Sequence, residues 1–218
     1  INNNHSIGAY YQNEYAKNIN KSHLISNVLE DNEFYDKWET TADNIIKNTP
    51  RHAANMYYNG QIKKLNIDFN ADYIWNKGIQ NTENDEISQM QENRHVTTYS
   101  KNRSSMLAEK LVLTYPVGKG VLRFGEEYTS SRSNNQFNTE YADLNHAASK
   151  IKEENTACFV EIMQQLGTFS ISAGLRYEHV NYDYFEKANS DANLSRTYHN
   201  VFPSFNAATR LGNVQMSL

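Results

Sequence analysis

Between residues 65 and 75 the sequence alternates between apolar and polar side chains. The apolar series occupies the odd positions, namely Leu65, Ile67, Phe69, Ala71, Tyr73 and Trp75. The intervening even positions are polar except at Ile74, and they include Asn66, Asp68, Asn70 and Asp72. Alternate side chains of a β-strand point to opposite faces, whereas a helix would distribute such a series around its circumference. The segment is therefore predicted to be a strand with one apolar and one polar face.

The same pattern returns farther along the chain. Phe169 and four further apolar residues alternate with a polar series that ends in Arg176 and Glu178; the four are Ile171, Ala173, Leu175 and Tyr177. Weaker alternation elsewhere brings the total to about nine predicted strands, near residues 5–17, 51–59, 62–76, 94–115, 120–132, 154–165, 168–184, 197–211 and 213–218. Residues 19–50 fit a short helix and an extra hairpin equally well, because their periodicity is weak. The fold class is therefore predicted to be all-β.

The predicted connections differ in length in a regular order. Tight turns, each with a glycine, are expected at residues 59–61, 116–119, 166–168 and 211–213. Long polar loops are expected at residues 77–93, 133–153 and 185–196. Short turns on one side and long loops on the other are typical of outer-membrane barrels. We therefore expect an antiparallel meander that forms part of a large transmembrane β-barrel.

The length of the alternating segment also fits a membrane. Ten steps of about 3.4 Å, tilted by about 40°, rise about 26 Å along the membrane normal, and the apolar band of such barrels is about 25 Å tall. Tyr73 and Trp75 would lie at one interface, and Tyr57, Tyr58 and Tyr115 at the other. The lipid-facing residues are then Leu65, Ile67, Phe69, Ala71, Tyr73, Trp75, Ile171, Ala173, Leu175 and Tyr177. The polar residues facing the lumen are Asn66, Asp68, Asn70, Asp72, Arg176 and Glu178.

Composition excludes several other classes of protein. A mean hydropathy of -0.78, with no run of about 18 apolar residues, excludes a membrane-spanning helix. The net charge is -4 and the sequence has no basic stripe, so nucleic acid is not an expected partner. The single Cys158 and the scattered histidines form no metal-ligand pattern, and no phosphate loop or nucleophile motif occurs. No metal, no cofactor and no enzyme activity is therefore predicted.

Three short motifs carry a resemblance to a known family. They are Asp68-Phe69-Asn70-Ala71-Asp72-Tyr73, Gly174-Leu175-Arg176-Tyr177-Glu178 and Val201-Phe202-Pro203-Ser204-Phe205. In order and spacing they resemble the barrel segments of TonB-dependent outer-membrane receptors, in particular the outer-membrane β-barrel proteins of the Bacteroidetes group, over about residues 50–218. The resemblance implies a 22-stranded barrel in the bacterial outer membrane, contact with outer-membrane lipid, an upstream plug domain inside the barrel, and energised import through TonB. A surface lipoprotein is a further expected partner.

Two expectations concern the extent and the function of the chain. The sequence starts without an initiator Met and ends within an alternating segment, so residues 1–218 are expected to be a partial barrel domain, with the plug and the remaining strands absent. The expected function is part of a TonB-dependent receptor that imports a nutrient across the outer membrane. The alternative is a soluble, lectin-like β-sandwich module, in which the apolar faces would meet in a dry core. Alternation alone fits both.

Overall fold

The computed structural model describes residues 4–141, 145–211 and 214–217, and these form one nine-stranded sheet with the strands in chain order. The strands are β1 (His5–Glu30), β2 (Glu33–Ile62), β3 (Leu65–Ser88), β4 (Arg94–Val117), β5 (Gly120–Thr139), β6 (Ala147–Leu166), β7 (Phe169–Glu186), β8 (Leu194–Leu211) and β9 (Val214–Ser217). A single 3₁₀ turn, η1 (Ser190–Ala192), precedes β8.

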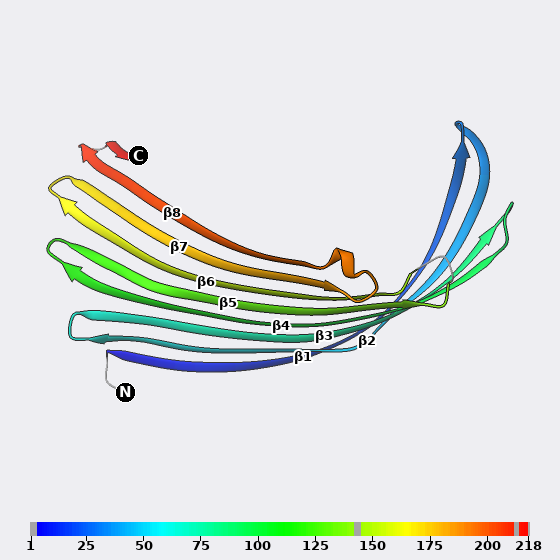
Figure 1. Cartoon of the computed structure of the whole chain (residues 1–218), viewed down its shortest axis with the longest axis horizontal. Coiled ribbons are helices and arrows are strands. Elements are labelled where there is room, and N and C mark those ends of the chain that lie inside the picture. The colour runs from blue at the N-terminus through cyan, green and yellow to red at the C-terminus, as the bar shows by residue number, and fades with distance from the viewer. Residues whose placement is uncertain (1–3, 142–144, 212–213, 218) are drawn as a thin grey trace.

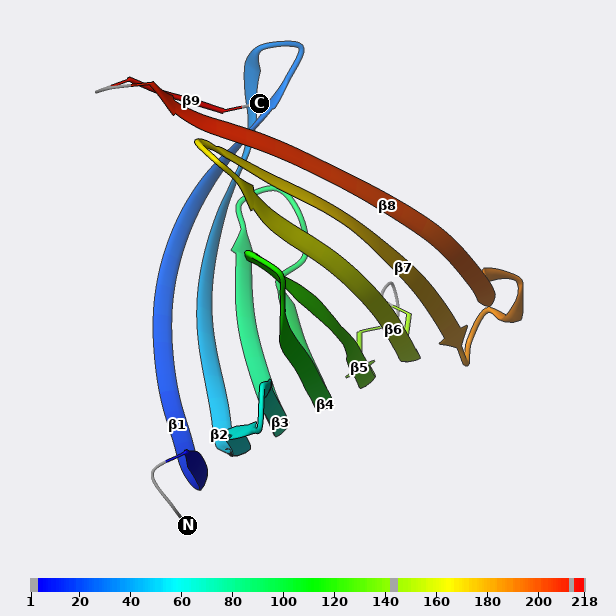
Figure 2. The same cartoon turned by 90° about the vertical axis from the view of Figure 1, so that its left-hand side faces the viewer.

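Each strand pairs antiparallel with the next one in the chain. The sheet is arched, and the long β1–β2 and β3–β4 hairpins extend well past the other strands at one end (Figures 1 and 2). Within the described residues no second sheet packs against it, and the backbone of each strand lies beside those of its sequence neighbours only. The all-β antiparallel meander is therefore confirmed, whereas the sandwich alternative is wrong because it needs two facing sheets.

The pairing register decides which residues share a face. Phe69 on β3 is paired with Leu111 on β4, and the row continues through β5 and β6 to Tyr177 on β7. Leu175 lies two residues from Tyr177 and therefore on the same side of the sheet as Phe69. We call this side the apolar face. The polar face carries Asn66, Asp68, Asn70, Asp72, Arg176 and Glu178.

Burial in this sheet is the reverse of that in a water-soluble domain. Among the described residues only Val96 and Ala157 are buried apolar residues. On the apolar face Leu175 is 49% exposed and Val160 is 45% exposed. On β5, β6 and β7 the polar-face side chains beside the band are more covered than the apolar-face ones, as expected on the concave side of an arch where side chains converge. An apolar convex face of this extent requires an apolar surrounding.

The apolar face of each strand has a limited length. On β3 it runs from Leu65 to Trp75 and then changes to Lys77, and on β7 it runs from Phe169 to Tyr177. These stretches of eleven and nine residues match the 9–11 residues that a tilted transmembrane strand needs. Two exposed carboxylates, Glu109 and Glu126, interrupt the face. The apolar band is therefore confined to the part of the sheet next to the short turns.

The strands are longer than predicted on the other side of this band. Residues 19–50 are part of the β1–β2 hairpin, which turns at Asp31 and Asn32, both with positive φ. Most of the predicted loops also continue as paired strand, to Ser88 on β3 and to Thr139 on β5. Alternation disappears there because both faces are wet and carry polar side chains, yet backbone pairing continues. The remaining connections on this side are residues 89–93, 140–146 and 187–193.

The short turns are partly where the glycines predicted them. Gly118 and Gly167 adopt φ of 61° and 65°, as expected for turn glycines. The turn predicted at residues 59–61 lies instead at Lys63 and Lys64. Gly60 is a paired residue of β2, where a side chain would collide with the Tyr58 hydroxyl and the His5 ring. Tyr58 consequently lies opposite Phe69, in the middle of the band rather than at its edge. The turn predicted at residues 211–213 lies outside the described residues.

Candidate functional site on the polar face

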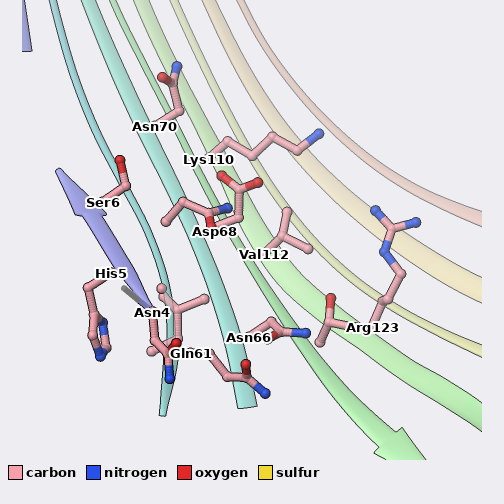
Figure 3. Close-up of a pocket in the computed structure, with 14 residues that line it drawn as sticks. Asn4, His5, Ser6, Gln61, Asn66, Asp68, Asn70, Lys110, Val112 and Arg123 are labelled. Carbon is pink, nitrogen blue, oxygen red and sulfur yellow. The ribbon is translucent and has the colours of Figure 1, made fainter. Parts of the chain in front are cut away.

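The polar face is hollowed near the short turns. An open groove of about 690 Å³ lies between the start of β1 and the middle strands, and Figure 3 shows its polar side chains. Its lining includes Asn59, Gln61, Asn66, Asp68, Lys110 and Arg123. The groove is lined by β1 to β5, because the arch brings alternate residues of these strands to one concave surface.

The predicted polar row on β3 divides into two pairs. Asn70 and Asp72 are held by hydrogen bonds: Asn55 Nδ2 donates to Asn70 Oδ1 at 2.9 Å and to Asp72 Oδ1 at 2.7 Å, and Asn70 Nδ2 donates to Asp72 Oδ2 at 2.6 Å. Asn66 and Asp68 are exposed and have no side-chain partner within the described residues. Asn66 and Asp68 are therefore the members of this row that are free to bind a solute or another protein segment.

An ion-pair network occupies the polar face next to the groove. Glu127 on β5 accepts from Lys110 Nζ at 2.6 Å and from Arg176 Nη2 at 2.7 Å. Arg176 Nε also donates to Glu178 Oε1 at 2.6 Å on its own strand, β7. Arg176 and Glu127 lie on strands that are not neighbours, so the network crosses β6. Charge-assisted hydrogen bonds of this kind are stronger than neutral ones.

A small residue makes this crossing possible. Ala157 on β6 is paired directly with Glu127 on one side and with Glu178 on the other. Ala157 is only 1% exposed, so its short side chain leaves the space between these two positions to the Arg176–Glu127 contact. Alternation in the sequence predicted Arg176 and Glu178 on the polar face but not the roles of Glu127, Lys110 and Ala157, since the register that aligns these residues is a tertiary property.

A second cluster lies beyond the apolar band, on the extended hairpins. Asp36 is fully buried and accepts from the Ser88 hydroxyl at 2.7 Å and from the backbone N–H of Lys37, Gln89 and Met90. Burial acts to raise the pKa of Asp36, but these hydrogen bonds outweigh it and hold the pKa below its ordinary value. Hydrogen bonds to Asp36 therefore hold β2 against the connection that follows β3.

Arg94 stabilises the same region. Its guanidinium lies 4.2 Å from the centre of the Trp38 ring and 2.6 Å from Glu86. A cation over an indole is a favourable electrostatic contact. No periodic pattern in the sequence predicted a role for Asp36 or Arg94, because the contacts of both residues depend on cross-strand neighbours.

The described residues show no helix that is long and apolar enough to span a bilayer. They also place no group of three or more His, Cys, Asp or Glu side chains where it could hold a metal ion.

A single arched antiparallel sheet with an exposed apolar band, about ten residues tall, and a polar concave face defines the wall of a transmembrane β-barrel. The sequence supports the same class. The pattern of the outer membrane protein beta-barrel family matches residues 57–218, and the chain belongs to that family. Its location is therefore the bacterial outer membrane. The more specific tie to the Bacteroidetes group stays a prediction.

Several solved structures match the chain at low sequence identity. The ferric citrate transporter FecA, in its unliganded form, is 12% identical, with a TM-score of 0.54 over 98% of this chain and 38% of that one. The copper transporter OprC is 10% identical, with a TM-score of 0.48 over 98% of this chain and 43% of that one. The ferric yersiniabactin uptake receptor FyuA from Yersinia pestis is 8% identical, with a TM-score of 0.44 over 96% and 41%.

The chain thus spans about two fifths of the length of these solved proteins. The similarity to FecA bears on the fold, and the resemblance to the TonB-dependent class is confirmed at that level. No curated protein sequence matches the chain.

Proposed function

We propose that this chain is part of the wall of a TonB-dependent outer-membrane receptor that imports a nutrient. The observation that carries the proposal is the polar concave face, where a hydrogen-bonded row and an ion-pair network line the inside of an arch whose outside is apolar. A wall with this polarity encloses a wet interior and faces lipid outside. The apolar-face residues named above would contact lipid, and those of the polar face would line the lumen.

The proposed receptor has a larger barrel than these nine strands. The outer edge of β1 is unpaired among the described residues, and each unpaired backbone group in hydrocarbon costs several kcal/mol. We therefore propose that further strands close the barrel. A lumen of that size would hold a plug, and Asn66 and Asp68, which have no side-chain partner among the described residues, are available to contact the plug or a passing solute.

Transport is proposed rather than catalysis. Three carboxylates of the polar face, Glu127, Glu161 and Glu178, are engaged in ion pairs: Glu127 binds two cations, and Arg123 Nη1 lies 3.2 Å from Glu161 Oε2. Groups held in this way stabilise a wall and are not poised as a nucleophile and base. The expectation that the protein is no enzyme stays a prediction, as does a surface lipoprotein partner.

Two experiments on the full-length gene product test the proposal. The first is fractionation: recovery from the membrane only with detergent supports the barrel wall, and recovery in the soluble periplasmic fraction contradicts it. The second compares the growth of a deletion strain with that of wild type on single nutrient sources. We expect at least one source on which the deletion strain fails, and on which depletion of TonB reproduces the failure in wild type. Growth of the deletion strain on every source tested would contradict nutrient import.

A further inference from the structure

A basic patch lies on the outer surface of the wall, directly past the apolar band. The face that carries Phe69 and Trp75 continues toward the long hairpins with Lys77 on β3. The next three strands contribute further basic residues to the same face. The complete patch consists of Lys77, Lys101, Arg103, Arg132, Lys150 and Lys152.

The register packs these charges closely. Lys77 is directly opposite Arg103, and Arg103 is followed in the same row by Asn134 and Lys150. In the adjoining row, on the side of the band, Arg132 is directly opposite Lys152. Directly opposed side chains in a sheet lie about 4.5–5.5 Å apart at their Cβ atoms, and like charges there are destabilising. The sheet itself therefore gives no reason for two such pairs.

Among the described residues, acidic side chains neutralise only one member of the patch, Lys152. Glu154 pairs with Lys152 at 2.9 Å, and Asp183, directly opposite Lys152, accepts from the Ser195 hydroxyl at 2.6 Å. No ion pair involves the other basic residues of the patch within the described residues, and Arg103, Arg132 and Lys150 are exposed. This excess of positive charge occurs in a chain whose net charge is -4. The patch therefore attracts an anion from outside the chain.

The patch also has a defined shape. An open groove of about 520 Å³ passes between the side chains of β4, β5, β6 and the end of β7. Lys101, Arg103 and Lys150 line it together with the exposed ring of Phe185. A groove with cationic walls and one aromatic side fits a charged group attached to an apolar body.

Position along the wall identifies the anion. Trp75 ends the apolar row on β3, and tryptophan is enriched where acyl chains meet headgroups. Lys77 follows two residues later on the same face, so the patch lies at the headgroup level on the side of the long connections, which is the extracellular side in such barrels. We propose that the basic patch binds the phosphate groups of a phosphorylated glycolipid in the outer leaflet. The inference rests on the lipid-facing assignment of the apolar face in the proposed function.

The test uses the folded full-length protein in detergent micelles and three probes: diphosphorylated lipid A, the same lipid with its phosphates removed, and inorganic phosphate. The test variant carries Arg103→Gln, Arg132→Gln and Lys150→Gln. The control carries Lys63→Gln, Lys64→Gln and Lys119→Gln, which remove the same charge at the short turns. Binding of each lipid is measured by native mass spectrometry, and folding by heat-modifiable gel mobility.

We expect wild type and the control to bind the phosphorylated lipid equally, and the test variant to bind it on the order of 100-fold more weakly, at about fivefold for each basic side chain near a charged membrane surface. Equal binding by the test variant, or equal binding of the dephosphorylated lipid by wild type, would overturn the proposal. Displacement of the lipid by millimolar inorganic phosphate would show a site for free phosphate and overturn the lipid assignment. If the test variant does not fold, single Arg103→Gln and Arg132→Gln variants answer the same question.

The proposal and the proposed function can fail separately. Recovery of the protein in the soluble periplasmic fraction would remove both. Recovery in the outer membrane together with unchanged lipid binding by the test variant would overturn the basic patch alone.

Discussion

Arg176 on β7 donates to Glu127 on β5 at 2.7 Å, across the whole width of the intervening strand β6. The contact joins strands that share no backbone hydrogen bond. It is possible because Ala157, the β6 residue between the two carboxylates Glu127 and Glu178, is small. The ion pair therefore joins β5 and β7 through side chains alone.

The first prediction concerns this coupling. Arg176→Met leaves Glu127 and Glu178 without their shared cation, and we expect it to lower the free energy of unfolding by about 1–3 kcal/mol, as for hydrogen bonds to charged groups. Lys119→Met in the β4–β5 turn is the control and should change little. Urea unfolding of the full-length protein in lipid vesicles measures both. A double-mutant cycle with Glu127→Gln should give a coupling energy, and strict additivity would show that the contact contributes nothing.

The second prediction tests exposure of the apolar face to lipid. Phe69→Arg places a charge near the middle of the band and should cost about 2–4 kcal/mol if the side chain meets hydrocarbon. Asp68→Arg, one residue away on the polar face, should cost much less, because this exposed side chain has no side-chain partner within the described residues and points to the concave side. The free energy of folding into vesicles compares the two. Equal costs would show that the faces are not divided between lipid and water.

The third prediction is a substitution on the apolar face that should stabilise the folded protein. Glu126 is exposed on the apolar face, next to Leu111 and Cys158 in its row. Acidic residues on a lipid face cost less than basic ones, so Glu126→Leu should stabilise the folded barrel by about 1–2 kcal/mol. The same vesicle titration measures the gain. A loss of stability would indicate that another protein surface, and not lipid, covers this carboxylate.

The fourth prediction concerns the turn glycines. Gly167 has φ of 65°, and an alanine in that left-handed region is strained by roughly 1–2 kcal/mol. Gly78 lies within β3, where an added Cβ would meet no atom within 4 Å. We therefore expect Gly167→Ala to destabilise the protein and Gly78→Ala to be neutral or slightly stabilising. Thermal or urea unfolding measures the stability of the two single variants. A Gly78→Ala variant less stable than Gly167→Ala would contradict the turn assignment.

The fifth prediction is a pH dependence on the long β3–β4 hairpin. His95 Nδ1 lies 2.7 Å from the Asp85 carboxylate, and that hydrogen bond, with the nearby negative charges, raises the pKa of His95 above its ordinary value. A raised folded pKa means that the contact stabilises the hairpin fully below the unfolded pKa of about 6.5, and that this stability is lost as the pH rises through the folded pKa.

NMR titration of the His95 ring measures this pKa directly. Asp85→Asn should return the pKa toward about 6.5, since it removes the largest cause of the shift. An unchanged His95 titration in the Asp85→Asn variant would contradict the pairing.

Much of the wall could be predicted from single residues and their spacing. Alternation from Leu65 to Trp75 and from Phe169 to Tyr177 identified both faces of two strands, because side chains of a strand alternate whatever its partners are. The meander and the turns at Gly118 and Gly167 followed from the same local rules. Past the apolar band, for example beyond Trp75 on β3, both faces of the strands carry polar side chains. The sequence therefore does not alternate there, and these parts of the strands were predicted as loops.

Tertiary structure alone decided which side chains meet. The basic patch combines one or two residues from each of four strands, which is why the sequence shows no basic stripe although the folded sheet has a cationic surface. Arg176 and Glu127 are far apart in the chain, and Gly60 looks like a turn residue until its neighbours Tyr58 and His5 are placed. The physical reason is register. The alternation of side chains within a strand follows from the sequence alone, but the pairing between strands determines which charged side chains lie opposite one another and which form ion pairs.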